Sequence, residues 1–212
     1  MTALLIASAL ACLAGEYLDL RPLVYVAKPL ATVATILIAV RAAGPVSPRY
    51  RTLVTLGLVC SLAGDVFLML PGDRFIAGLA SFLVAHLLYI GAFATHGGRL
   101  RDWPAAGVFV LAGGVLALLW PTLGALRVPV IAYVAVIATM GWQALARFHA
   151  TGSASARLAA MGAMSFLVSD SALAVRKFRG DFAGSVLVVL GTYWLAQWCI
   201  ARSVSHSSMG EA

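Results

Sequence analysis

Long runs of apolar residues separated by short polar segments dominate this chain. Each run is roughly 20 residues long, the length that an α-helix needs to cross the hydrocarbon core of a bilayer. The interruptions are rich in proline, glycine and arginine, as in Pro71-Gly72-Asp73-Arg74, and such clusters end one helix and begin the next. The pattern predicts eight helices, at about residues 1–20, 22–42, 51–71, 74–97, 103–121, 126–148, 157–178 and 182–203.

These helices leave little chain for any other structure. We expect residues 1–203 to form a single transmembrane domain, an all-α polytopic helical bundle, and residues 204–212 to form a flexible C-terminal tail. The first run lacks a basic segment at its start and matches a processing site only loosely. It is therefore interpreted as a retained helix rather than a signal peptide.

Composition supports a membrane protein. Of the 212 residues, 62% are hydrophobic and 11% are charged, whereas soluble domains have roughly 45–50% apolar and about 25% charged residues. A soluble domain and a disordered chain are both excluded. The net charge is +7, but the cations flank the apolar runs, which is typical of side chains beside lipid headgroups. We expect membrane lipid and no nucleic acid as partners.

The loop charges predict an orientation. Eight helices place both termini on one side, where the loops carry eight Lys and Arg residues, including Arg99, Arg101 and Arg147, against six on the other side. The positive-inside rule then places the termini in the cytoplasm, by a narrow margin. The expected location is a bacterial inner membrane, crossed several times.

Four ionisable side chains lie inside the apolar runs, namely Lys28, Asp65, His86 and Asp170. A charge at bilayer depth costs at least about 2.5–3.5 kcal/mol, so each needs a partner or a function. Counted from the face opposite the termini at ~1.5 Å per residue, Lys28 and Asp65 lie about 9 Å deep. On the same count Asp170 lies about 12 Å and His86 about 18 Å deep. The clustering predicts one cavity that opens toward that face.

Uncharged polar side chains accompany these four. They are Tyr89, Tyr133, Ser169, Tyr193 and Gln197. Tyr89 follows His86 on one helix stripe, and Tyr193 and Gln197 stand one turn apart. Ser169 belongs to a serine-rich run that supplies hydroxyls to hold the Asp170 carboxylate.

Simpler interpretations exist for each of these residues. Lys28 could neutralise Asp65 only to fix helix packing, or could extend toward the headgroups beside a kink at Pro29. His86 could be an ordinary core residue, and the tyrosines and Gln197 could link helices by hydrogen bonds. We favour a functional site because two carboxylates, a histidine and a lysine converge at similar depth.

The segments around the two aspartates also resemble each other. Asp65 and Asp170 are 105 residues apart, and the same offset pairs Lys28 with Tyr133. A parallel four-plus-four duplication would explain this pseudo-repeat. Chance similarity is the alternative.

Paired carboxylates are the chemistry that this residue set supports. Zinc needs three or four His, Cys or carboxylate ligands, and His86 is the one histidine expected in the membrane interior, so we expect no metal. The chain has no GxSxG serine motif and no GxGD protease motif. One carboxylate kept neutral by burial could act as an acid, and the other, ionised beside a cation, as a base or electrostatic stabiliser.

The residues resemble the YhhN family, which includes bacterial YhhN proteins and animal lysoplasmalogenases. The resemblance spans about residues 20–200 and rests on Lys28-Pro29-Leu30, Ser61–Met69, Phe82–Tyr89, Phe166–Ser171 and the Tyr193 and Gln197 pair. It implies hydrolysis of the vinyl-ether bond of lysoplasmalogens to a fatty aldehyde and a glycerophospho-base. The implied substrate is a lysophospholipid, and no cofactor is needed.

This reaction needs a proton donor and an anionic or basic partner, because an enol ether hydrolyses after protonation of its β-carbon. We hypothesise that Asp65 and Asp170 are the catalytic acid/base pair, without assigning either role. His86 would orient groups or relay protons, and Lys28 would set charge or meet phosphate. The remaining positioning residues would be Tyr89, Tyr133, Ser169, Tyr193 and Gln197.

Two other functions fit the same residues. One is a proton-coupled small transporter or lipid-binding membrane protein, with the two aspartates and His86 as a proton relay. The other is a hydrolase of a different ether or ester lysolipid.

Overall fold

The computed structural model describes residues 1–95 and 103–205, and all its regular elements are helical. The eight α-helices are α1 (Thr2–Tyr17), α2 (Arg21–Val40), α3 (Pro48–Met69), α4 (Phe75–Ala94), α5 (Val108–Leu119), α6 (Arg127–Thr151), α7 (Ala154–Arg179) and α8 (Ser185–Arg202). Short 3-10 turns at Pro104–Gly107, Trp120–Thr122 and Gly124–Leu126 flank α5. The predicted all-α polytopic bundle is confirmed.

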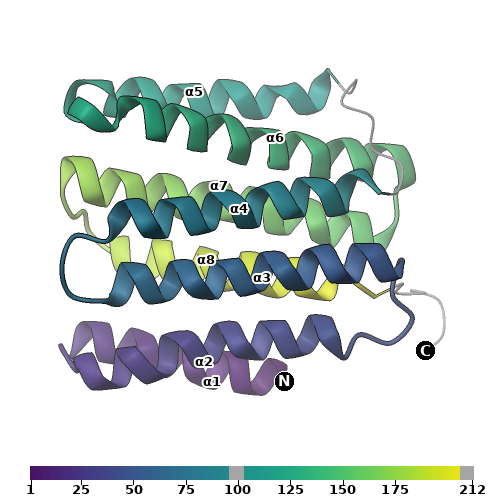
Figure 1. The fold of residues 1–212 in the computed structure, drawn as a ribbon, viewed down its shortest axis with the longest axis horizontal. Helices are drawn as coiled ribbons and strands as arrows, with labels where there is room; N and C mark the ends of the chain where they lie inside the picture. The colour runs from purple at the N-terminus through teal and green to yellow at the C-terminus, as the bar shows by residue number, and fades with distance from the viewer. Residues whose placement is uncertain (96–102, 206–212) are drawn as a thin grey trace.

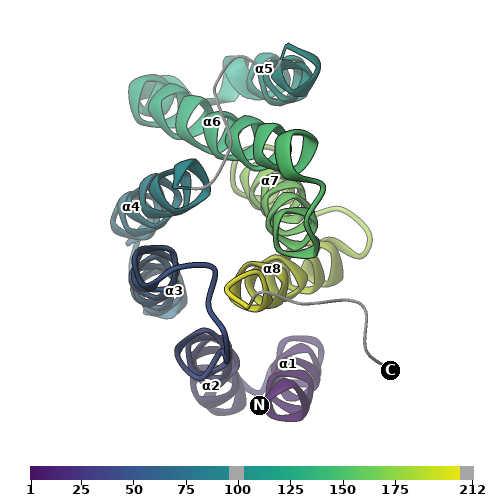
Figure 2. The same ribbon diagram turned by 90° about the vertical axis from the view of Figure 1, so that its right-hand side faces the viewer.

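The helices run side by side along one axis (Figure 1). Seen end-on, α2, α3 and α4 form one side of the bundle and α1, α8 and α7 the other, and α6 closes the far end (Figure 2). Helix α5 lies outside this ring and packs against α6 and α7. The connections α1–α2, α3–α4 and α7–α8 meet at one end of the bundle, opposite the N- and C-termini (Figure 1).

Among the described residues, seven helical segments are long and apolar enough to span a bilayer, and the one at α5 includes its flanking 3-10 turns (Ala105–Thr122). Helix α1 is shorter than the expected run of 1–20, because it ends at Tyr17 where the polar stretch beginning at Glu16 takes over. Val110 on α5 is 77% exposed and Val128 on α6 is 76% exposed, and such apolar side chains suit lipid rather than water. The chain is therefore an integral, multi-pass membrane protein.

Local sequence signals set several of the helix ends. The hydroxyls of Ser47 and Ser153 accept hydrogen bonds from the backbone N–H groups three residues on and so cap α3 and α7. Helix α6 ends at Gly152, whose φ of 59° lies in the left-handed region that glycine adopts readily. Arg99, Arg101, the end of the expected helix 74–97 and residues 206–212 of the expected tail lie outside the described residues.

Small residues on α3 make room for aromatic rings on α4. A Cβ atom at Gly57 would lie 2.4 Å from the Tyr89 ring, and one at Gly64 would lie 2.6 Å from the Phe82 ring. No real side chain tolerates such contacts. The two glycines therefore let α3 and α4 approach closely and aim the α4 stripe that carries His86 into the bundle.

Candidate functional site

Asp65 on α3 is held by three side-chain donors from two neighbouring helices. Its Oδ2 atom accepts hydrogen bonds from Thr32 Oγ1 of α2 at 2.7 Å and from Tyr193 Oη of α8 at 2.6 Å. Lys28 Nζ of α2 lies 3.4 Å from Oδ1. The Asp65 side chain is 2% exposed, so its charge is compensated inside the protein by Lys28 and by the two hydroxyls.

A hydrogen-bonded chain behind Asp65 orients Tyr193. Gln197 Nε2 donates to Tyr193 Oη at 2.7 Å, so the tyrosine proton points to the carboxylate. Tyr89 Oη of α4 donates to Gln197 Oε1 at 3.5 Å and lies 3.3 Å from Ser61 Oγ. These side chains are all buried, and the chain fixes the angle at which α8 presents Tyr193 to Asp65.

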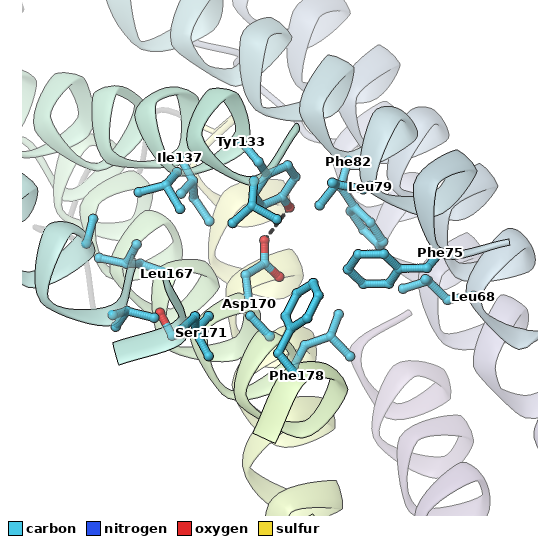
Figure 3. Close-up of a pocket in the computed structure, with 17 residues that line it drawn as sticks. Leu68, Phe75, Leu79, Phe82, Tyr133, Ile137, Leu167, Asp170, Ser171 and Phe178 are labelled. Carbon is cyan, nitrogen blue, oxygen red and sulfur yellow. Dashed lines mark hydrogen bonds between the residues drawn. The ribbon is translucent and has the colours of Figure 1, made fainter. Parts of the chain in front are cut away.

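Asp170 on α7 has different surroundings. Its Oδ2 atom accepts a hydrogen bond from Tyr133 Oη of α6 (Figure 3). His86 Nε2 of α4 lies 3.9 Å from the same oxygen, too far for a direct hydrogen bond. Within residues 1–95 and 103–205, no lysine or arginine forms an ion pair with Asp170.

The imidazole of His86 is fully buried, and neither of its nitrogens has a hydrogen-bond partner among the described residues. Its ring stands edge to face against Phe166 at 4.8 Å and Tyr133 at 5.4 Å between centroids. Buried polar groups without partners are rare in proteins and require an explanation. The His86 nitrogens are therefore available to form hydrogen bonds with a molecule that enters the space beside Asp170.

The serines near Asp170 do not hold its carboxylate, contrary to our expectation. Ser169 Oγ donates to the Val189 carbonyl of α8 at 2.9 Å, and Ser165 Oγ donates to the Thr192 carbonyl at 2.8 Å. A hydroxyl on a helix often bonds a neighbouring backbone carbonyl. Their effect is to tie α7 to α8, although Ser169 also lines the cavity described below.

The two aspartates occupy corresponding places in the two halves of the chain. Lys28 of α2 contacts Asp65 of α3, and Tyr133, at the same offset in α6, contacts Asp170 of α7. The fourth helix of each half contributes to the other half, since Tyr193 of α8 reaches Asp65 and His86 of α4 approaches Asp170. The arrangement agrees with a four-plus-four repeat, while the duplication itself stays a prediction.

Two cavities meet at Asp170. A polar cavity of about 420 Å³ reaches inward from the bundle end opposite the termini, past Lys28 and Asp65. A smaller apolar cleft of about 60 Å³ lies between α4, α5, α6 and α7. Asp170 and Phe82 are among the residues that line both, and Figure 3 shows them in the apolar cleft. A molecule in both spaces would have one polar and one apolar end, with its middle beside the Asp170 carboxyl group.

In the part of the chain that the structure describes, no three His, Cys, Asp or Glu side chains come together as a metal site. By their chemical nature, Asp65, Asp170, His86 and the phenol hydroxyls are able to transfer protons or to stabilise charge.

Sequence reasoning missed two polar residues. Thr32 lies one turn after Lys28 on the same face of α2, and that spacing could have placed it at Asp65. Arg147, expected in a loop, is 2% exposed within α6. Its guanidinium donates to Tyr50 at 3.1 Å and to Ser155 at 2.9 Å, near the end that carries the termini. Arg147 therefore links α3, α6 and α7 and is no juxtamembrane charge.

Comparison with known proteins decides the family. The model of the YhhN family matches residues 23–204, which includes every side chain of the site and helices α2 to α8 almost completely. The chain belongs to the YhhN family. The match begins after helix α1 and after the first two residues of α2.

Relatives of this YhhN family member include named enzymes. It is 37% identical over 161 residues to the lysoplasmalogenase TMEM86A of Bos taurus, covering 74% of this chain and 66% of the relative. It is 33% identical to a lysoplasmalogenase of Mycobacterium bovis over 174 residues, 77% of this chain and 63% of the relative. The chain thus spans about two thirds of the length of these two proteins.

The family also contains bacterial proteins without an assigned activity. The membrane protein YhhN of Escherichia coli O157:H7 is 28% identical over 181 residues, 85% of this chain and 86% of that protein. No solved structure matches the chain significantly. Membership in the YhhN family confirms the resemblance seen in the sequence.

Proposed function

We propose that this protein is a lysoplasmalogenase, which hydrolyses the vinyl-ether bond of a lysophospholipid to a fatty aldehyde and a glycerophospho-base. The meeting of the polar cavity and the apolar cleft at Asp170 carries the proposal. A lysoplasmalogen has its vinyl ether between a polar glycerophosphate and an aliphatic chain. Seated in both spaces, it would present this bond to Asp170. The names of the bovine and mycobacterial relatives support the same activity.

The surroundings of the two aspartates favour different roles for them. Asp65 faces Lys28 and two hydroxyl donors, so its ionised form is compensated. Asp170 borders an apolar cleft without a lysine or arginine partner among the described residues. A buried charge without a counter-ion is costly, which favours a neutral Asp170 that keeps its proton. We therefore assign Asp170 as the acid and Asp65 as the stabilising anion.

On this assignment, Asp170 transfers its proton to the β-carbon of the vinyl ether, and the π electrons form the new C–H bond. The resulting oxocarbenium ion lies near the Asp65 carboxylate, whose negative charge stabilises it. Water adds to the α-carbon and returns a proton to Asp170. The hemiacetal then breaks its bond to the glycerol oxygen, which takes the Asp170 proton. The hemiacetal hydroxyl gives its own proton back to Asp170 as the aldehyde forms.

His86 and the hydroxyl groups would position the reacting groups. The gap of 3.9 Å between His86 Nε2 and Asp170 Oδ2 is suited to a group that hydrogen-bonds to both. The attacking water is our candidate for that group. Tyr133 would orient the Asp170 carboxyl group. Gln197 would hold the Tyr193 hydroxyl in place, and that hydroxyl would orient the Asp65 carboxylate.

A panel of lysolipids tests the function directly. Purified protein in maltoside detergent is incubated with 1-alkenyl, 1-alkyl and 1-acyl lysophosphatidylethanolamine, and free aldehyde and fatty acid are measured by mass spectrometry. We expect aldehyde from the alkenyl lipid alone. Fatty acid from the acyl lipid would identify an ester hydrolase instead. A transporter would instead release no product from any of these lipids and would take up one of them into proteoliposomes when a pH gradient is applied.

The apolar cleft should set the length of the aliphatic chain. Ala112 on α5 is buried and lines the cleft, so Ala112→Phe would fill space that we assign to the aliphatic chain beyond the carbons next to the vinyl ether. We expect kcat/KM for a 16-carbon alkenyl substrate to fall about tenfold or more. A short-chain substrate should be affected much less. Leu111→Phe is the matched control, because Leu111 is 60% exposed on the same helix; an equal effect of both changes contradicts the assignment.

We infer an orientation with the termini in the cytoplasm of a bacterial inner membrane. The excess of loop cations on the terminal side supports it, although Arg147 is buried and drops out of that count. The polar cavity would then open on the far side. Pro71→Cys, at an exposed position of the α3–α4 connection, in a variant without the native cysteines, should react with a membrane-impermeant maleimide added outside spheroplasts. Labelling only after the spheroplasts are lysed would show the opposite orientation, with the termini outside the cytoplasm.

A further inference from the structure

The mouth of the polar cavity carries charged side chains from three parts of the chain. They come from the end of α1 and the start of α2, from the α3–α4 connection, and from the end of α7 with the loop after it, and they are Glu16, Arg21, Asp73, Arg74, Arg176, Lys177 and Asp181. Both signs are present. The mouth therefore does not attract every anion. Which ligand it binds depends on which of its charged side chains are not already paired with each other.

Most of these charges already have partners. Lys177 Nζ lies 3.3 Å from Asp73 Oδ1 and links α7 to the α3–α4 connection. Arg176 Nε lies 2.6 Å from Asp181 Oδ1. The hydrogen bond from Lys177 lowers the pKa of Asp73, and that from Arg176 lowers the pKa of Asp181. Both carboxylates are therefore ionised at neutral pH, and each lies beside a cation in the structure.

Arg21 is paired with a residue that does not line the cavity. Its Nε atom, at the start of α2, lies 3.2 Å from Oδ1 of Asp19, two residues earlier in the short link between α1 and α2. Within residues 1–95 and 103–205, Arg74 and Glu16 are the two charged residues of the mouth that form no ion pair. One is a guanidinium at the start of α4 and the other a carboxylate at the end of α1.

We propose that Arg74 and Glu16 form a subsite for a zwitterionic phospholipid headgroup, in which Arg74 binds the phosphate and Glu16 binds the ammonium group. This inference rests on the proposed lysoplasmalogenase function. A guanidinium matches two phosphate oxygens at once, and a carboxylate complements an ammonium ion. A headgroup with both charges fits a mouth that leaves one charge of each sign unpaired.

The position of the subsite agrees with the chemistry deeper in the cavity. Asp170 lies six residues before Arg176 on α7, or about 9 Å along the helix, and both line the same cavity. A phosphate at the mouth would therefore place the glycerol backbone inside the cavity and the vinyl ether near Asp170. Headgroup binding would thus hold the reacting bond in place, which lowers the entropic cost of the reaction.

Three substrates that differ only in the headgroup test the subsite. They are 1-alkenyl lysophosphatidylethanolamine, 1-alkenylglycerol 3-phosphate and 1-alkenylglycerol. We expect Arg74→Gln to raise KM about tenfold for the two phosphate-containing substrates and to leave KM for alkenylglycerol unchanged. Glu16→Gln should raise KM severalfold for the ethanolamine substrate alone. Arg127→Gln is the control, since Arg127 begins α6 at the same end of the bundle and stacks on Trp120 outside the cavity.

A binding measurement separates this inference from the proposed function. 1-Alkyl lysophosphatidylethanolamine has no vinyl bond to cleave, and its affinity can be measured by titration calorimetry in maltoside detergent. Arg74→Gln should weaken its binding about tenfold, and Arg127→Gln should not. Equal affinity in wild type and Arg74→Gln, or equal KM changes for all three alkenyl substrates, overturns the subsite. Absence of aldehyde from every alkenyl substrate, with normal binding of the alkyl lipid, overturns the function and leaves the subsite standing.

Discussion

Asp170→Asn is expected to lower the rate of aldehyde release from a lysoplasmalogen at least about 100-fold, because the amide has no proton to give to the vinyl ether. The amide is neutral and nearly the same shape as the carboxylic acid that we assign to Asp170. Its oxygen can still accept the hydrogen bond from Tyr133. The variant should therefore fold normally, with a melting temperature in detergent close to that of wild type.

Asp19→Asn is the control for this experiment. Asp19 lies in the α1–α2 link, pairs with Arg21 and does not line the polar cavity. It should retain wild-type turnover. Turnover by Asp170→Asn within a few-fold of wild type would show that another group donates the proton. Loss of both activity and folding would contradict our assignment of a neutral carboxyl group.

Lys28→Met is expected to destabilise the protein by roughly 3–5 kcal/mol, since it leaves the buried Asp65 carboxylate without its cation. Asp65→Asn should have a similar effect by stranding the Lys28 ammonium group. The double variant removes both charges, so its melting temperature should recover most of what either single change loses. Activity should not recover, because the anion that stabilises the oxocarbenium ion is missing.

The comparison of single and double variants separates a structural from a catalytic role. Melting temperature in detergent and rate of aldehyde release are measured on the same four proteins. If the double variant recovers both stability and activity, the Lys28 and Asp65 pair has a structural role only. A double variant as unstable as the single ones would show that the two charges act independently.

Much of the architecture could be predicted from the pattern of apolar residues. Backbone hydrogen bonds must be satisfied inside a bilayer, so an apolar run of about 20 residues can only be a helix there. The stripe of Phe82, His86 and Tyr89 on α4 was also predictable, because helical periodicity places these residues on one face. The depth of Lys28 and Asp65 followed from helix rise alone, and their contact in the structure agrees with it.

Other features needed the tertiary structure. Arg147 looked like a loop charge because it lies near the end of its apolar run, yet Tyr50 and Ser155, from two other helices, satisfy it inside the bundle. Ser169 looked like a partner of Asp170, but its hydroxyl faces the backbone of α8. In both cases the partner lies on another helix.

The pattern of apolar and polar residues was enough to predict the membrane environment, the number of helices and the few polar residues that require an explanation. Which of these residues lie together became clear only from the packed helices: Asp65 contacts a lysine, and Asp170 lies beside a tyrosine and a histidine at the edge of an apolar cleft. The physical reason is that hydrophobic periodicity sets which face of a helix is buried. The rotation and spacing that select each contact depend on close packing, such as that of Gly57 against Tyr89.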